Sequence, residues 1–180
     1  MQIYPITSQN TNKVNFNGIC NFRFNESGIS VLEKDWPEDY ILKRTKQLVK
    51  VPVKRYQKSG KGKPKEEMSL MERITLQAHY FVSYLWSDGK REGTKHIQEV
   101  VSKSLKDSRT DGRVILDAQM IDGKTSPAGF YYKLGFRFAN NTYNKILANW
   151  LKRSGKKFDA PSVTGVMYLP EEYIEHCLRY

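Results

Sequence analysis

A run of aromatic and β-branched residues at 79–86 is the feature that most restricts how this chain can fold. Residues of this kind favour a buried strand. A polar turn with two glycines follows at 87–94, and apolar residues then recur at helical spacing along one face. The apolar positions of this helix are Ile97, Val100, Val101 and Leu105. A strand, a glycine-containing turn and a helix in this order predict an α/β fold.

The alternation of strand and helix continues towards the end of the chain. A continuous apolar segment follows the turn at 111–112, and the Ser-Pro pair at 126–127 is typical of a helix start. The expected elements are a strand at 113–118, a helix at 126–135, a strand at 136–138, a helix at 143–153, a strand at 163–169 and a last short helix from Pro170. This part of the chain therefore predicts a β-α-β-α unit followed by two more strands.

The N-terminal part of the chain has a weaker pattern. Residues 1–18 are polar with few apolar anchors, which indicates a flexible lead-in, so a single domain is expected at 19–180. The expected elements are a hairpin at 19–24 and 28–32, an amphipathic helix at 37–49, a mobile basic loop at 54–65 and a helix at 70–76. The basic loop has two interpretations, a contact with phosphate or nucleic acid and an ordinary solvated loop.

Charge and composition limit the classes of partner. The 180 residues carry a formal net charge of +11, which attracts polyanions such as nucleic acid, an anionic membrane surface or a phosphate-rich cofactor. The sequence has no apolar run of the roughly 18 to 20 residues needed to cross a bilayer and no secretory signal, so no membrane span and a cytoplasmic location are expected. Cys20 and Cys177 lack metal-ligand spacing and are expected to be unpaired thiols.

The segment at 126–136 carries the most specific motif, Ser-Pro-Ala-Gly-Phe-Tyr-Tyr-Lys-Leu-Gly-Phe. It resembles the motif that acetyltransferases of the GNAT superfamily carry after their second core strand. In that family a helix carries a tyrosine four residues before the glycine of Leu-Gly-Phe, and here Tyr131 stands four residues before Gly135. The order of strands and helices is also similar, and the resemblance covers about half of the chain, 80–168.

The resemblance implies a fold and an activity. The fold would be a GNAT-like mixed, twisted sheet with flanking helices, splayed between its fourth and fifth strands to admit the pantetheine arm of the cofactor. The segments at 80–86 and 114–118 would be those two strands. The activity would be N-acetyl transfer from acetyl-CoA to a primary amine of a small molecule or protein, by direct attack. Many members of the family form homodimers, so a homodimer is one expected arrangement.

The polar turn at 87–94 is the expected cofactor site, because a helix that begins after a glycine-bearing loop presents free backbone N–H groups to an anion. The residues assigned to cofactor binding are Lys90, Arg91, Glu92, Gly93, Thr94, Lys95 and Tyr131. The family pattern is Gln or Arg, two residues, Gly, one residue, then Gly or Ala. If Gly93 is the first glycine, Lys95 takes the small position; if Gly93 is the second, Arg91 takes the place of the first glycine. Both registers remain open from the sequence.

The resemblance also assigns a proton donor. Tyr131 would be the acid for the departing thiolate, since a phenol with a pKa near 10 is protonated at neutral pH. No general base stands out: His79 is a candidate for relaying a proton, and Asp117 or Tyr84 for a place near the acceptor. His96 and His176 have no partners at metal-ligand spacing, so no metal is expected. The alternative function is a basic nucleic-acid-binding module without catalysis.

Overall fold

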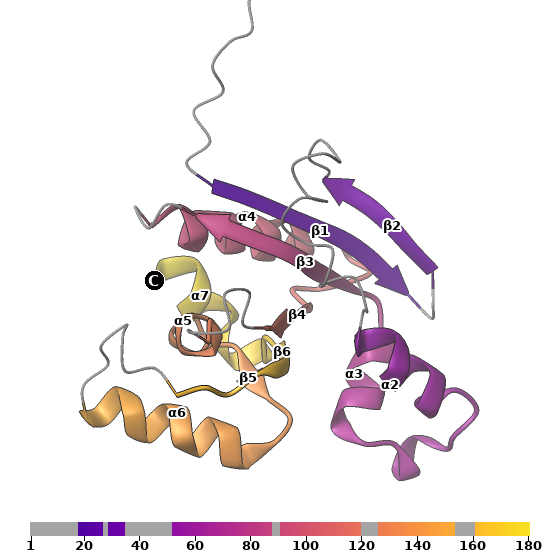
Figure 1. Cartoon of the computed structure of the whole chain (residues 1–180). Coiled ribbons are helices and arrows are strands. Elements are labelled where there is room, and N and C mark those ends of the chain that lie inside the picture. Colours follow the sequence, from indigo (N-terminus) through magenta and orange to yellow (C-terminus); the bar gives the residue numbers. More distant parts are fainter. Residues whose placement is uncertain (1–17, 27–28, 35–51, 88–90, 120–125, 154–160) are drawn as a thin grey trace, which may run out of the picture.

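The computed structural model describes residues 18–26, 29–34, 52–87, 91–119, 126–153 and 161–180. The fold is mixed α/β, with a six-stranded sheet in the order β2-β1-β3-β4-β6-β5 (Figure 1). The strands are β1 (Gly18–Glu26), β2 (Ile29–Lys34), β3 (His79–Ser87), β4 (Val114–Ala118), β5 (Arg137–Phe138) and β6 (Gly165–Tyr168). The helices are α2 (Pro52–Gly60), α3 (Leu70–Leu76), α4 (Glu92–Lys106), α5 (Ala128–Lys133), α6 (Asn141–Arg153) and α7 (Ile174–Arg179), with 3-10 turns η1 (Lys65–Glu67) and η3 (Glu171–Tyr173).

The centre of the sheet is a parallel pair, β3 and β4, whereas the other neighbouring strands are antiparallel. Parallel strands need a crossover connection, and α4 provides it. The ladder between β3 and β4 has only three residue pairs, of which Val82 with Leu116 is the last. Beyond that point β3 stays paired with β1 as far as Ser87, and β4 stays paired with β6 as far as Ala118. The two central strands therefore no longer pair with each other at their C-terminal ends.

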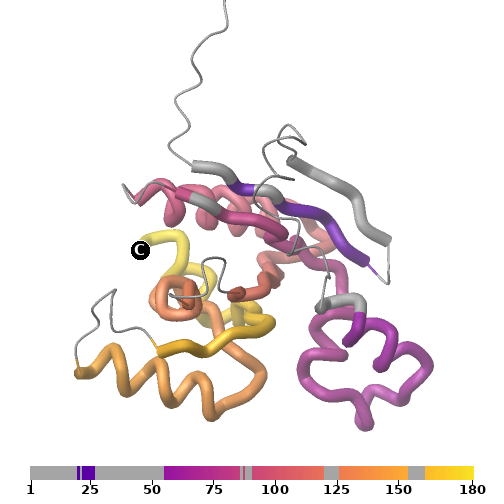
Figure 2. The backbone as a smooth tube through the Cα atoms, in the orientation of Figure 1, coloured from indigo at the N-terminus to yellow at the C-terminus, as the bar shows by residue number. Residues whose placement is uncertain are grey.

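Both faces of the sheet are covered by helices. Alternate residues of β4 belong to different apolar clusters: Val114 and Leu116 lie in the larger cluster with α4, and Ile115 lies in the smaller cluster beside α3. In Figure 1, α4 lies behind β1 and β3, while α5, α6 and α7 gather near β5. The backbone trace of Figure 2 shows the α2–α3 pair and α6 at opposite sides of the molecule.

The apolar positions of α4 are buried in the structure with one exception. Ile97, Val100 and Val101 are fully buried, as the helical spacing predicts. Leu105 was expected on the same face but is 45% exposed. Ser104 faces inwards in its place, and its hydroxyl donates to the Arg113 carbonyl oxygen at 3.0 Å. The last turn of α4 is thus held by a polar link to the turn before β4 and not by apolar packing of Leu105.

Most of the elements that the pattern predicts in the described ranges are present. The hairpin of β1 and β2, the helix at 70–76, the strand at 79–86 and the elements from α4 to α7 are confirmed, with ends that differ by a few residues. The expected helix at 37–49 and nearly all of the lead-in at 1–18 lie outside the described residues. No described helix is long and apolar enough to cross a membrane. Cys20 and Cys177 are both buried and form no disulfide, and burial raises the pKa of the Cys177 thiol to about 12.

The prediction of a basic loop at 54–65 is wrong, because the first part of this segment belongs to α2. Contacts with α3 stabilise the helix: the Gln57 side-chain amide donates to the Thr75 carbonyl oxygen at 2.9 Å. Gly60 ends the helix against α3, where an added Cβ would lie 2.9 Å from Leu76 Cδ1. Tertiary packing therefore overrides the local preference of a Lys- and Gly-rich segment for a loop.

A buried carboxylate, Glu72, joins α2 to α3. Its backbone N–H donates to the hydroxyl of Ser69 at 3.3 Å, and its side chain accepts from the Ser69 N–H at 2.8 Å, which completes a capping box. The Ser59 hydroxyl and the Lys63 ammonium donate to the same carboxylate at 2.6 and 2.9 Å. These donors, Ser59 first, lower the pKa of Glu72 to about 2.

We predict that Glu72→Gln destabilises the protein at neutral pH and that this loss disappears in acid. Because the pKa is lower in the folded state than its ordinary value of 4.5, ionised Glu72 stabilises the fold above about pH 4.5. That stability is lost as the pH falls through the folded pKa of about 2. Urea denaturation of both proteins between pH 7 and pH 2 measures the difference. The exposed Glu66→Gln is the control and should show no such convergence, whereas a constant gap for Glu72→Gln would contradict the prediction.

Candidate functional site

The ladder between β3 and β4 ends before either strand does, and this opening of the ladder lies at the C-terminal end of the parallel pair. On the β4 side, Asp117 and Ala118 pair with Val166 and Gly165 of β6 and have no partner in β3. Helix α4 follows directly after β3, so its N-terminus lies at the same end. The opening of the ladder therefore lies between the ends of β3 and β4, at the start of a 15-residue helix.

The N-terminus of α4 has the features of an anion-binding site. Arg91, the N-cap residue, has a left-handed backbone with φ 63°, and no side chain caps this end of the helix. The Lys95 N–H donates to the Arg91 carbonyl oxygen at 3.2 Å, so the N–H groups of Glu92, Gly93 and Thr94 come before the first helical hydrogen bond. These three donors and the positive end of the helix dipole favour a phosphate.

Gly93 sits where three elements meet. It is buried, and an added Cβ would lie 3.1 Å from Ser87 Oγ at the end of β3 and 3.5 Å from Phe130 Cζ in α5. The absence of a side chain thus allows α4, β3 and α5 to approach one another closely. Sequence reasoning identified Gly93, but neither the turn that contains Ser87 nor the motif that contains Phe130 indicated that these two side chains would lie beside it.

Helix α5 carries Tyr131 to the opening. Tyr131 is 7% exposed, and its ring makes edge contacts with Phe130 and Phe136 at centroid distances of 5.1 and 6.0 Å. Burial raises the pKa of the phenol above its usual 10, and the neighbouring Cys20 and Asp117 raise it further. The hydroxyl is therefore protonated throughout the neutral and mildly alkaline range. Cys20 pairs with Leu85 in the ladder of β1 and β3, beyond the last β3–β4 pair, so Tyr131 lies at the splayed end.

Asp117 is the carboxylate at the opening. The side-chain amide of Gln119 donates to both of its oxygens, at 2.9 and 3.0 Å. Burial raises the pKa of Asp117, and the bonds from Gln119 oppose that shift. The sequence pointed to Asp117 only as one of two candidates, and nothing in the sequence indicated that Gln119 would hold it.

His79 does not lie with Tyr131. It begins β3, six residues before Leu85, which corresponds to roughly 20 Å along an extended strand. The ring is fully buried: Nδ1–H donates to the Gln77 carbonyl oxygen at 2.8 Å, and Nε2 faces the Asn25 amide at 3.5 Å. Burial first, and then the charge of Arg113, lower the pKa of His79 to about 4. Its position and contacts are those of a neutral structural histidine.

Most of the other expected site residues lie in a single helix. Arg91, Glu92, Gly93, Thr94 and Lys95 lie together at the start of α4, and Lys90 lies outside the described residues. Lys95 forms an exposed ion pair with Glu92 at 3.0 Å. The described residues contain no group of three or more His, Cys, Asp or Glu side chains suited to a metal ion.

Comparisons with known proteins leave the family open. No protein-family model, no curated protein and no solved structure matches this chain. The function of this chain is therefore inferred from the opening of the β3–β4 ladder and from the residues around it.

We predict that Gly93→Val destabilises the protein by about 1–3 kcal/mol, because its side chain has no room between Ser87 and Phe130. Gly93→Ala should change the free energy of unfolding by less than about 1 kcal/mol, since the gain in helix propensity offsets a small movement of the Ser87 hydroxyl. Urea denaturation measures both. Ser87→Ala removes the nearest atom and should make Gly93→Ala stabilising; a Gly93→Val variant as stable as wild type would contradict the close packing.

Proposed function

We propose that this chain is an acetyl-CoA-dependent N-acetyltransferase with a GNAT-like fold. The observation that carries the proposal is the parting of β3 and β4 after Val82 and Leu116, next to the uncapped start of α4. A gap between parallel strands that is flanked by an anion-binding helix end suits a long ligand with a phosphate-rich head and a narrow arm. Acetyl-CoA is such a ligand.

The sheet supports the proposed family in its arrangement. The resemblance expects a splay between two central strands at 80–86 and 114–118, and the short ladder of β3 and β4 lies in these segments. Two strands, β5 and β6, follow the tyrosine-bearing helix α5, as the family order requires. One difference is that β3 is the third described strand of the chain, whereas the family counts the equivalent strand as the fourth.

The backbone at the start of α4 favours the second register of the cofactor loop. In that register Arg91 takes the place of the first glycine, and its φ of 63° is the left-handed conformation that glycine adopts most easily. Gly93 then takes the second, small position, where close packing against Ser87 and Phe130 requires a small residue. In this register the chain departs from the family pattern at two positions, with Arg91 in the place of the first glycine and Asp88 in the place of Gln or Arg.

The residues around the opening suit the donor. The N–H groups of Glu92, Gly93 and Thr94 would bind the pyrophosphate, and the Arg91 side chain, which is exposed, would add charge. Acetyl-CoA supplies the activated acetyl group as a thioester. The diverging edges of β3 and β4 would hold its arm and direct the reacting end towards Tyr131.

Two side chains would move the protons of the transfer. Tyr131 donates its hydroxyl proton to the sulfur as the carbon–sulfur bond breaks, and its raised pKa keeps the phenol protonated until that step. Asp117, directly or through water, takes the proton that the attacking amine loses when the new carbon–nitrogen bond forms. The proton that Asp117 gains returns through water to the Tyr131 oxygen, so both groups recover their starting state. The acceptor is a primary amine of a small molecule or protein.

We predict that acetyl-CoA binds with one-to-one stoichiometry in isothermal titration calorimetry at moderate salt, with nucleic acid removed beforehand. Tyr131→Phe should retain this binding and lower the rate of acetyl transfer by about 10²–10⁴-fold, because it removes only the proton donor. Tyr132→Phe is the matched control and should leave the rate unchanged, since that ring stacks on the Arg137 guanidinium at 4.0 Å. Absence of binding would refute the proposed function and favour the nucleic-acid-binding alternative. An unchanged rate in Tyr131→Phe would refute the proton-donor role.

A second prediction concerns Asp117. Asp117→Asn should lower the transfer rate by about 10²-fold while acetyl-CoA affinity stays the same, because only the proton acceptor is lost. With wild type, the rate should fall as the pH drops through the raised pKa of this carboxyl, where the acceptor becomes protonated. A pH–rate profile of both proteins tests this role. A profile that is identical in shape for the two would rule Asp117 out.

A further inference from the structure

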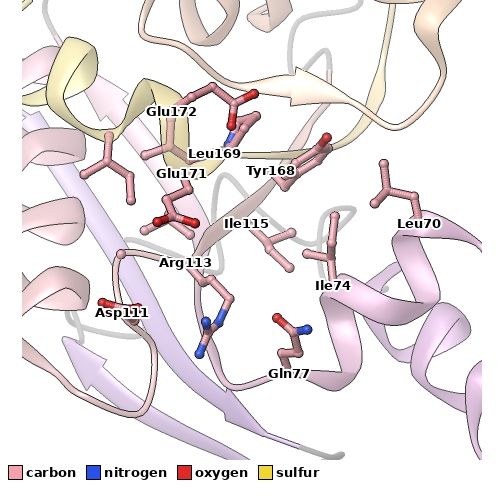
Figure 3. Close-up of a pocket in the computed structure, with 14 residues that line it drawn as sticks. Leu70, Ile74, Gln77, Asp111, Arg113, Ile115, Tyr168, Leu169, Glu171 and Glu172 are labelled. Carbon is pink, nitrogen blue, oxygen red and sulfur yellow. The ribbon is translucent and has the colours of Figure 1, made fainter. Parts of the chain in front are cut away.

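A hollow lies at the other end of β4, away from the proposed donor site. It has a volume of about 340 Å³ and is bordered by α3, the turn before β4 and the segment after β6 (Figure 3). β4 contributes its first residues, Val114 and Ile115, to this hollow, whereas its last residues border the opening described above. The two sites therefore use opposite ends of the same strand.

The hollow has an apolar side. Leu70 and Ile74 project from α3, and Figure 3 shows Ile115 between them and the polar residues. Leu70 is 37% exposed, one of few large hydrophobic side chains that stay so accessible in the described part of the chain. An accessible leucine beside a buried isoleucine offers a contact surface for one aliphatic side chain of a ligand.

The facing side of the hollow carries three carboxylates. Asp111, Glu171 and Glu172 lie there, and none of them forms an ion pair with a Lys or Arg of the described ranges. The single cation of the lining, Arg113, directs Nε to the Ala78 carbonyl oxygen at 2.9 Å and Nη2 to the Arg109 carbonyl oxygen at 2.7 Å. Carboxylates without cation partners are notable in a chain with a formal net charge of +11.

We propose that this hollow docks a basic peptide segment of a partner protein. An aliphatic side chain of the segment contacts Leu70 and Ile74, and Lys or Arg side chains on either side of it pair with Asp111, Glu171 and Glu172. The arrangement disfavours nucleic acid and other polyanions, which the three carboxylates repel. The hollow is acidic, whereas the molecule as a whole is basic. A basic partner is therefore repelled by the remaining surface and attracted to the hollow.

The test is fluorescence anisotropy with a fluorescein-labelled peptide, Lys-Lys-Leu-Lys-Leu-Lys-Lys, and the same peptide with Gln in place of Lys. The basic peptide should bind saturably and the uncharged one should not. Replacing Glu171 and Glu172 together by Gln should weaken binding by about tenfold, and the loss should shrink at high salt. Leu70→Ser should weaken binding at every salt concentration, because it removes the apolar contact.

The matched control replaces Glu66 and Glu67 of η1 by Gln, an equal change of charge on an equally short 3-10 turn outside the hollow. This pair should leave peptide affinity unchanged. Equal losses in the two double variants, or no saturable binding by wild type, would overturn the proposal. A wild-type dimer in sedimentation that becomes monomeric with Glu171→Gln and Glu172→Gln would also overturn it, with a second copy as the occupant. Binding here needs no acetyl-CoA, so the result is independent of the proposed enzyme activity.

Discussion

The parallel pairing of β3 with β4 is the constraint on which the rest of the structure depends. Since parallel neighbours cannot be joined by a tight turn, the chain must cross back along a helix, and α4 fills that role. The crossover fixes the N-terminus of α4 at the end of β3. Gly93 then allows this helix end to approach both Ser87 and Phe130, so that α5 and its tyrosine come to the same place. The parallel pairing thus brings the uncapped start of α4 and the Tyr131 phenol together.

The elements that could be predicted from the sequence are those whose signal is local. The aromatic run of β3 and the buried face of α4 at Ile97, Val100 and Val101 follow from side-chain period alone. The helical state of α2 could not be predicted, because it depends on Gln57 and Gly60 packing against the next helix, α3, and not on the local sequence. The exposure of Leu105 also depends on a partner outside the helix, since Ser104 turns inwards to reach Arg113 in the following turn.

The residues of the candidate site also fall into two groups, those that a local sequence pattern predicted and those that it did not. Tyr131 and Gly93 could be predicted because a motif and a turn mark them, whereas the place of Asp117 at the opening follows from strand pairing that no local pattern encodes. His79 illustrates the converse: a histidine among aromatics looks chemically available in the sequence, but the fold buries it between Gln77 and Asn25, which leaves it neutral. The residue types in the sequence indicated which chemistry the candidate site could carry out. The location of that site followed only from the ladder of β3 and β4.

The short ladder also divides the sheet into two panels, β2-β1-β3 and β4-β6-β5, which three residue pairs join directly. A ligand that fills the gap would touch both panels, and those contacts exist only in the folded chain. By mass action, a ligand present at 100 times its dissociation constant adds about 2.7 kcal/mol to the free energy of unfolding. If the donor of the proposed function is that ligand, the melting temperature of this protein rises and falls with the concentration of the donor.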